Sequence, residues 1–153
     1  MNARRAAAAL ALVGVVVLVI AEFTTVFEVT VGSLEVVKRR ATGGENHGYA
    51  LLAIAVLAAV MALLALRGAR PPAFALVALG VVALAITLAV DLPDTRASGG
   101  LPESLAYERA QARAGTGLHL SIAAAAMLGI AGGLFLSASS GQHRHSGGAP
   151  RRG

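Results

Sequence analysis

Four long apolar runs divide the chain, and they constrain its fold more than any other feature of the sequence. The runs cover residues 6–27, 49–66, 73–90 and 117–136. Each is close to the length, about 20 residues, that a helix needs to cross a hydrocarbon core about 30 Å thick. In a chain of 153 residues, four crossings leave only short loops and tails. We therefore predict one four-span membrane domain over residues 1–136, followed by a disordered cytoplasmic tail over residues 137–153.

The connections between the runs predict an antiparallel bundle of four transmembrane helices in an all-α membrane fold. Residues 67–72 hold a glycine just past one helix end and two prolines at the start of the next, which forces a tight turn. Residues 27–31 and 34–37 alternate β-branched side chains around Gly32-Ser33, which predicts a short extracytoplasmic β-hairpin. Residues 102–114 follow a proline with helix formers, which predicts a short surface helix.

The first apolar run also fits a cleaved secretory signal peptide. It has a basic start, an apolar stretch and the small-residue pattern Val19-x-Ala21 before Glu22. The stretch from Val15 to Ile20 has no polar, turn-prone cleavage region, however. We therefore expect the first run to be retained as a membrane span.

The charged residues are divided unequally between the two sides of the predicted bundle. Seven arginines and no carboxylate lie in the N-terminus, the 67–72 turn and the C-terminal tail. All eight carboxylates lie in or beside the other two connections, together with six bases. Lysine and arginine are retained on the cytoplasmic side during insertion, so both termini and the turn are placed there. The net charge of +5 then reports orientation and contact with anionic lipid headgroups, and not a nucleic-acid partner.

Polar residues near the outer ends of the predicted helices form the candidate site. Ionisable groups inside a span are costly, so each needs a reason. Counting residues from the inner ends places five of them at a similar depth, together with the hydroxyl of Thr87: Glu22, His47, Tyr49, Asp91 and His119. One interpretation is a site, in which Glu22 and His119 carry a proton or two histidines and a carboxylate bind a metal. The simpler interpretation is that these residues satisfy one another and anchor the helix ends at the interface.

No recognisable motif for catalysis or cofactor binding accompanies this polar layer. The sequence has no cysteine, nucleophile elbow, zinc-binding helix motif, phosphate-binding loop or dinucleotide fingerprint. We therefore predict neither enzyme activity, nor a metal, nor a cofactor.

Small residues at helical spacing predict where the helices pack. Gly14 in the first run, and Ala125, Gly129 and Gly133 in the fourth, form faces that let helix backbones approach closely. We expect these faces to pack within the bundle, with a homo-oligomer seam as the alternative.

Several short strings, taken in order, resemble small uncharacterised four-helix membrane proteins of high-GC actinobacterial genomes. They are Glu22-Phe23, His47-Gly48-Tyr49-Ala50-Leu51-Leu52, Arg67-Gly68-x-Arg70-Pro71, Asp91-Leu92-Pro93-Asp94, Tyr107-Glu108 and Gly115-Thr116-Gly117. The layout is also similar to that of the claudin type, although the tryptophan and cysteine pair of the claudin first loop are absent. The resemblance implies a multi-pass protein of a bacterial plasma membrane and brings no activity with it.

The lengths of the outer loops suggest what such a protein does. The two outer connections are each about 25 residues long, far longer than the inner turn, and long ordered loops are usually functional. We predict a non-enzymatic scaffold or accessory subunit that presents an extracytoplasmic surface to a membrane or envelope protein. The alternative is an ion- or proton-coupled transporter or channel subunit that uses Glu22 and His119.

Overall fold

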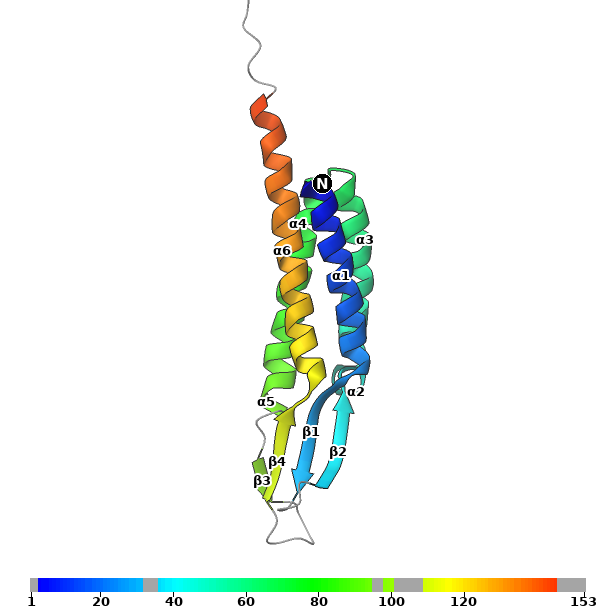
Figure 1. The fold of residues 1–153 in the computed structure, drawn as a ribbon, viewed down its shortest axis with the longest axis vertical. Helices are drawn as coiled ribbons and strands as arrows, with labels where there is room; N and C mark the ends of the chain where they lie inside the picture. Colours follow the sequence, from blue (N-terminus) through cyan, green and yellow to red (C-terminus); the bar gives the residue numbers. More distant parts are fainter. Residues whose placement is uncertain (1–2, 32–35, 95–97, 101–108, 146–153) are drawn as a thin grey trace, which may run out of the picture.

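The computed structural model describes residues 3–31, 36–94, 98–100 and 109–145, and it is mostly helical (Figure 1). The predicted cytoplasmic tail from residue 146 onward lies outside the described residues. The elements in chain order are α1 (Ala3–Phe23), β1 (Thr25–Val31), β2 (Val36–Thr42), α2 (Gly43–His47), α3 (Ala50–Leu66), α4 (Arg70–Ile86), the π-helical turn η1 (Thr87–Asp91), α5 (Leu92–Asp94), β3 (Ser98–Gly100), β4 (Arg109–Ala114) and α6 (Thr116–His145).

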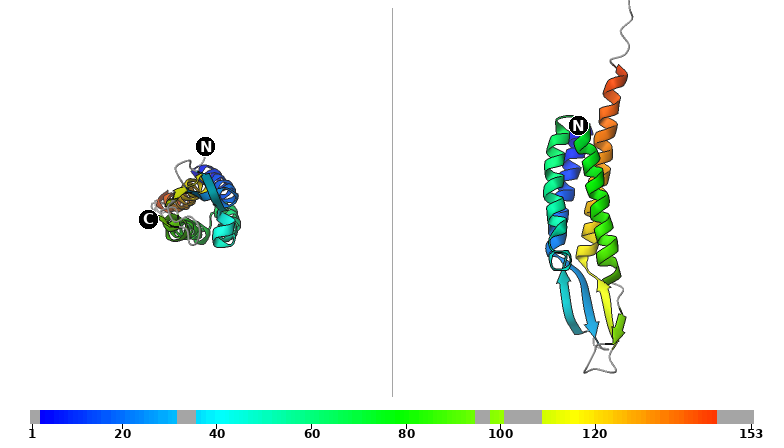
Figure 2. Two further views of the ribbon diagram at one scale, coloured as in Figure 1. Left: turned by 90° about the horizontal axis from the view of Figure 1, so that it is seen from below. Right: turned by 180° about the vertical axis from the view of Figure 1, so that it is seen from behind.

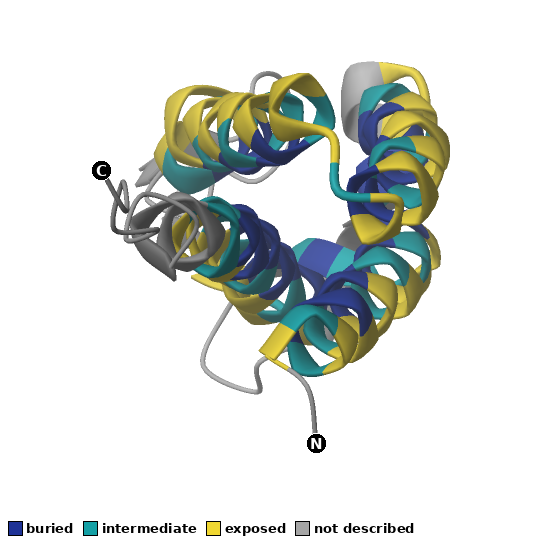
Figure 3. Ribbon diagram, turned by 90° about the horizontal axis from the view of Figure 1, so that it is seen from above, coloured by how far each residue is buried: buried dark blue, intermediate teal, exposed yellow. Residues whose placement is uncertain are grey.

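The four long helices form a bundle, and a small sheet stands at one end of it. Figures 1 and 2 show α1, α3, α4 and α6 side by side, with the strands beyond the end opposite the N-terminus. Seen along its axis in Figure 3, the bundle is a ring in the order α1, α3, α4 and α6, and each helix contacts its two neighbours. The predicted antiparallel hairpin of α3 and α4 is present, and Gly68 supplies its turn with a φ of 93°.

Three helices in the described part of the chain are long and apolar enough to cross a membrane. They are α1, the continuous segment Arg70–Asp91 formed by α4 and η1, and the first 24 residues of α6. The fourth member of the bundle, α3, is also apolar but shorter, at 17 residues.

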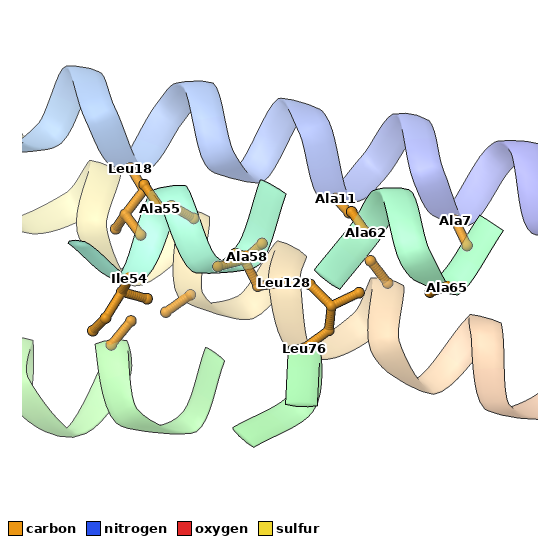
Figure 4. Close-up of a cluster of buried hydrophobic side chains, with 14 of the residues drawn as sticks. Ala7, Ala11, Leu18, Ile54, Ala55, Ala58, Ala62, Ala65, Leu76 and Leu128 are labelled. Carbon is orange, nitrogen blue, oxygen red and sulfur yellow. The ribbon is translucent and has the colours of Figure 1, made fainter. Parts of the chain in front are cut away.

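The bundle has small residues inside and large apolar residues outside. Alanines make up most of the buried core, and Leu18, Leu51, Leu76, Leu128 and Phe135 fill the remaining space (Figure 4). Many large apolar side chains instead face outward, among them Val16, Val60, Phe74, Val81 and Ile130. Association of helices in lipid depends on close backbone packing, and small residues permit it. This distribution is what a bundle needs when its outer surface meets acyl chains.

Glycines set the closest helix contacts, but only some of them are those that we predicted. A β-carbon on Gly80 of α4 would lie 2.8 Å from the carbonyl oxygen of Ala125 and from the amide nitrogen of Gly129. Gly14 of α1 faces α6 similarly, 3.1 Å from the Met127 β-carbon. Gly133, predicted to pack, is exposed, and its neighbour Gly132 makes the close contact with α4 instead.

The strands form a four-stranded antiparallel sheet in the order β2-β1-β4-β3. The predicted hairpin is present as β1 and β2, and its second strand continues to Thr42. The predicted surface helix is wrong over residues 109–114, which form β4 and pair with β1 from Phe27 to Val31. Local helix propensity there is outweighed by the hydrogen bonds available along β1. The preceding residues 101–108 lie outside the described part.

Two helix ends differ from the sequence prediction. The first helix ends at Phe23 and not at residue 27, because β1 begins at Thr25. The last helix continues past Leu136 to His145, so residues 137–145 of the predicted tail are helical. Ser137 and Ser139 do not end α6, since their hydroxyls donate to the carbonyls of Leu134 and Phe135 within the helix.

Candidate functional site: a buried polar layer where the bundle meets the sheet

Two carboxylates are fully buried at the sheet end of the bundle. Glu22 lies in the last turn of α1, and Asp91 ends the π-helical turn η1. Both lie in segments long and apolar enough to span a membrane. An ionisable side chain inside a membrane costs about 2.5–3.5 kcal/mol on insertion scales at the centre of a span. Their burial at such a cost makes this layer the candidate functional site.

Two hydroxyls extend the layer. Thr87 and Ser121 are also fully buried, and each donates to a carbonyl one turn earlier in its own helix, Ala83 and Gly117, over 3.0 Å. The layer thus takes oxygen-bearing side chains from α1, the α4–η1 segment and α6. Sequence analysis did not single out Ser121, although its spacing of four residues from Gly117 permits this bond within a helix.

The π-helical turn has a cause in the sequence. Pro93 has no N–H to donate to the carbonyl of Ala89, and its ring crowds that carbonyl in a regular α-helix. The chain widens into η1 over Thr87–Asp91, and the N–H of Leu92 bonds to the carbonyl of Thr87, five residues earlier. Single π turns of this kind occur frequently at functional sites. Here the turn carries both Thr87 and Asp91 into the buried layer.

A short helix covers Glu22. Thr42 caps α2 through a capping box, in which the amide of Glu45 donates to the threonine hydroxyl and the amide of Thr42 donates to the Glu45 carboxylate. Gly43 rests on Glu22, since a β-carbon there would lie 3.1 Å from Oε2 and 3.3 Å from the α-carbon. The helix also contacts α3, β2 and η1. It therefore closes the polar layer from the side of the sheet.

Tyr49 lies outside the layer and forms an aromatic pair with Phe23. The two ring centroids are 6.3 Å apart at 47°, and both side chains are more than half exposed. The Tyr49 ring also packs over Gly44, where any β-carbon would meet it. Gly48 and Tyr49 both adopt the left-handed conformation, which turns the chain sharply from α2 into α3. Exposed aromatic rings at a helix end are typical of the boundary between membrane and water.

Of the two predicted histidines, the structure describes the side chain of His119 alone, and this side chain does not join the buried carboxylates. His119 is exposed on α6, with its Nδ1 3.2 Å from the carbonyl oxygen of Gly115. It lies two residues from the buried Ser121, about 200° around the helix, and so on the opposite face. His47 is the last residue of α2, and its side chain lies outside the described residues. The predicted pair of Glu22 and His119 is therefore not brought together.

The described residues offer no ready metal site. No group of three or more histidine, aspartate or glutamate side chains in this part of the chain is close enough to hold a metal ion. The layer offers instead two buried carboxyls that can each bind a proton, with two buried hydroxyls at the same end of the bundle.

Close backbone contacts join the sheet to this end of the bundle. The N–H of Gly115 donates to the carbonyl of Val26 over 2.6 Å, and any β-carbon on Gly115 would collide with the Thr25 carbonyl. A β-carbon on Gly117 would lie 2.9 Å from the carbonyl oxygens of Thr24 and Thr25. Only glycine permits the start of α6 to approach the α1–β1 junction so closely. The sheet therefore cannot tilt on the bundle without breaking these contacts.

No known protein family, curated protein or solved structure matches this chain.

Proposed function

We propose that this chain is a four-span protein of a bacterial plasma membrane, with the sheet outside and both termini in the cytoplasm. All four long helices carry large outward-facing apolar side chains. On α3 the exposed ones are Val56, Leu57, Val60, Leu63, Leu64 and Leu66. At about 26 Å, α3 is close to the thickness of the hydrocarbon core. A helix with this surface, packed between α1 and α4, would be poorly placed in water.

The charges support the same orientation. In the described part, Arg4, Arg5, Arg67 and Arg70 lie at the end of the bundle away from the sheet. The acidic residues of the described elements, Glu22, Glu28, Glu45, Asp91 and Asp94, lie at the sheet end or within the sheet. Bases flanking helix ends favour the cytoplasmic side during insertion.

In this orientation the protein acts as a non-enzymatic scaffold or accessory subunit whose interaction surface is the sheet. The observation that carries this proposal is that both outer connections contribute strands to a single sheet, with β1 and β4 pairing across them. Two independent loops would need no such pairing. The seven-residue edge strand β2 leaves a row of backbone groups on which an extended segment of another protein could pair.

Site-specific photo-cross-linking in native membranes tests the proposal. Arg113 and Ala114 are exposed neighbours on β4 and point to opposite faces of the sheet. A photoreactive residue at one of these positions should give a discrete protein adduct, and one at the lipid-facing Ile130 of α6 should give none. If neither sheet position forms a protein adduct while insertion and abundance are normal, the sheet is not an interaction surface.

A proton- or cation-coupled transporter or channel subunit is the second candidate, and the buried carboxylates favour it. Intramembrane ionisable residues commonly mark ion or proton paths. On this alternative, Glu22→Gln abolishes a flux that Glu45→Gln leaves intact, because Glu45 is exposed and glutamine keeps the capping box. An unchanged flux in Glu22→Gln at normal expression would remove this candidate.

A further inference from the structure

The end of the bundle away from the sheet carries a concentrated positive charge drawn from two separate segments. Arg4 and Arg5 come from the first turn of α1, Arg67 caps α3, and Arg70 begins α4. No carboxylate from the described part of the chain lies at this end. The charge is therefore not offset locally by acidic side chains in these elements.

Contacts within this end fix the arginines relative to one another. The Arg4 guanidinium lies across the α3–α4 turn, with Nη1 3.1 Å and Cζ 3.7 Å from where a Gly68 β-carbon would be. A side chain at position 68 would displace it, and the φ of 93° also favours glycine there. The first turn of α1 is thereby held against the turn that carries Arg67 and Arg70. Arg5, Arg67 and Arg70 remain exposed around this contact.

Exposed apolar side chains lie directly below two of these arginines. Leu63 precedes Arg67 by four residues on α3, and Phe74 follows Arg70 by four residues on α4, so each pair shares one helix face. Leu63 is 56% exposed and Phe74 62% exposed. A ligand that fits here has a negatively charged head and an apolar chain that runs along the bundle.

We propose that this arginine-rich end binds the phosphate headgroup of an anionic phospholipid, whose acyl chains lie along the apolar faces below Arg67 and Arg70. Guanidinium groups match phosphate oxygens in geometry, and several can share one headgroup. A free phosphate would use the same arginines but gain nothing from Leu63 and Phe74. The proposal rests on the membrane placement proposed above and is independent of any role of the sheet.

Native mass spectrometry of the purified full chain in detergent tests the proposal, with phosphatidylglycerol and phosphatidylcholine as probes. The wild-type chain should retain phosphatidylglycerol in preference to phosphatidylcholine. Each lost arginine should weaken phosphatidylglycerol binding about fivefold, so Arg67→Gln with Arg70→Gln should weaken it about 25-fold. Arg113→Gln, which removes an exposed arginine from the sheet, should leave the preference unchanged.

Further variants and a soluble competitor separate lipid binding from misfolding and from binding of free anions. The double variant Arg67→Lys with Arg70→Lys keeps both charges and should retain the preference for phosphatidylglycerol. If Arg67→Gln with Arg70→Gln is unstable, the single variant Arg5→Gln serves in its place, and its affinity for phosphatidylglycerol should be about fivefold lower than that of the wild type. Equal binding of the two lipids by the wild type, or an unchanged preference in Arg67→Gln with Arg70→Gln, would overturn the proposal. Displacement of the lipid by an equal concentration of glycerol phosphate would show a site for free anions, and so would overturn it too. A topology measurement tests the membrane placement separately.

Discussion

Replacing Gly80 by alanine should loosen the contact between α4 and α6, whereas the same change at Gly133 should not. The alanine β-carbon at position 80 would lie 2.8 Å from the carbonyl oxygen of Ala125 and the amide nitrogen of Gly129. Both atoms belong to the backbone of α6 and cannot rotate away as a side chain would. A β-carbon at Gly133 meets nothing within 4 Å.

The comparison of these two variants isolates the packing contribution. Alanine improves helix propensity by about 1 kcal/mol at both positions, so this gain cancels in the difference between the variants. To reach an ordinary separation of 3.4 Å, α4 and α6 would have to part by about 0.6 Å at Gly80. Overpacking of this kind typically costs about 1–3 kcal/mol. We therefore expect Gly80→Ala to be about 1–3 kcal/mol less stable than Gly133→Ala.

Far-UV circular dichroism during a titration from mild detergent into SDS measures this difference. The chain has no tryptophan, so helix content is a more direct signal than intrinsic fluorescence. Gly132→Ala, whose β-carbon would lie 2.9 Å from the Ala73 carbonyl oxygen, should behave like Gly80→Ala. If Gly80→Ala is as stable as Gly133→Ala, the close packing of α4 on α6 described above is incorrect.

Three further changes test other parts of the structure. Gly115→Ala should destabilise the junction between bundle and sheet by about 1–3 kcal/mol, measured as increased proteolysis of the sheet, while Ala114→Ser beside it should have no effect. Tyr49→Ala should lower the free energy of unfolding by about 0.5–1.5 kcal/mol, because it removes the aromatic pair with Phe23 that Tyr49→Phe retains. Equal thermal stability of the two variants would contradict the pairing. Val60→Asp places a charge on the exposed face near the middle of α3 and should make the free energy of membrane insertion about 2.5–3.5 kcal/mol less favourable, whereas Val60→Leu should insert normally.

The features predicted correctly from the sequence are those that depend on local pattern. Apolar runs and the Gly68 turn specify the helices and the hairpin of α3 and α4, and the β-branched alternation specifies the hairpin of β1 and β2. The composition of residues 109–114 favours helix, whereas their strand conformation depends on β1, about 80 residues earlier in the chain.

The direction in which a helical residue faces is harder to predict than its depth. Counting along the helices places Glu22, Asp91 and His119 at a similar level, but only the first two are buried. The same limit explains why Gly132, and not Gly133, packs against α4. One residue corresponds to about 100° of helix rotation, and the rotation of α6 is set by its contacts with α1 and α4.

Cysteine accessibility in intact cells tests the four-span arrangement most directly, because the natural chain contains no cysteine to interfere. Single cysteines at the exposed positions Glu45 and Ala114 mark the sheet end, and those at Ala69 and Arg5 mark the arginine-rich end. We predict that a membrane-impermeant maleimide labels positions 45 and 114 in intact cells, and positions 69 and 5 only after permeabilisation. Labelling of positions 45 and 69 from the same side would show that α3 does not cross the membrane, and would contradict the four-span arrangement.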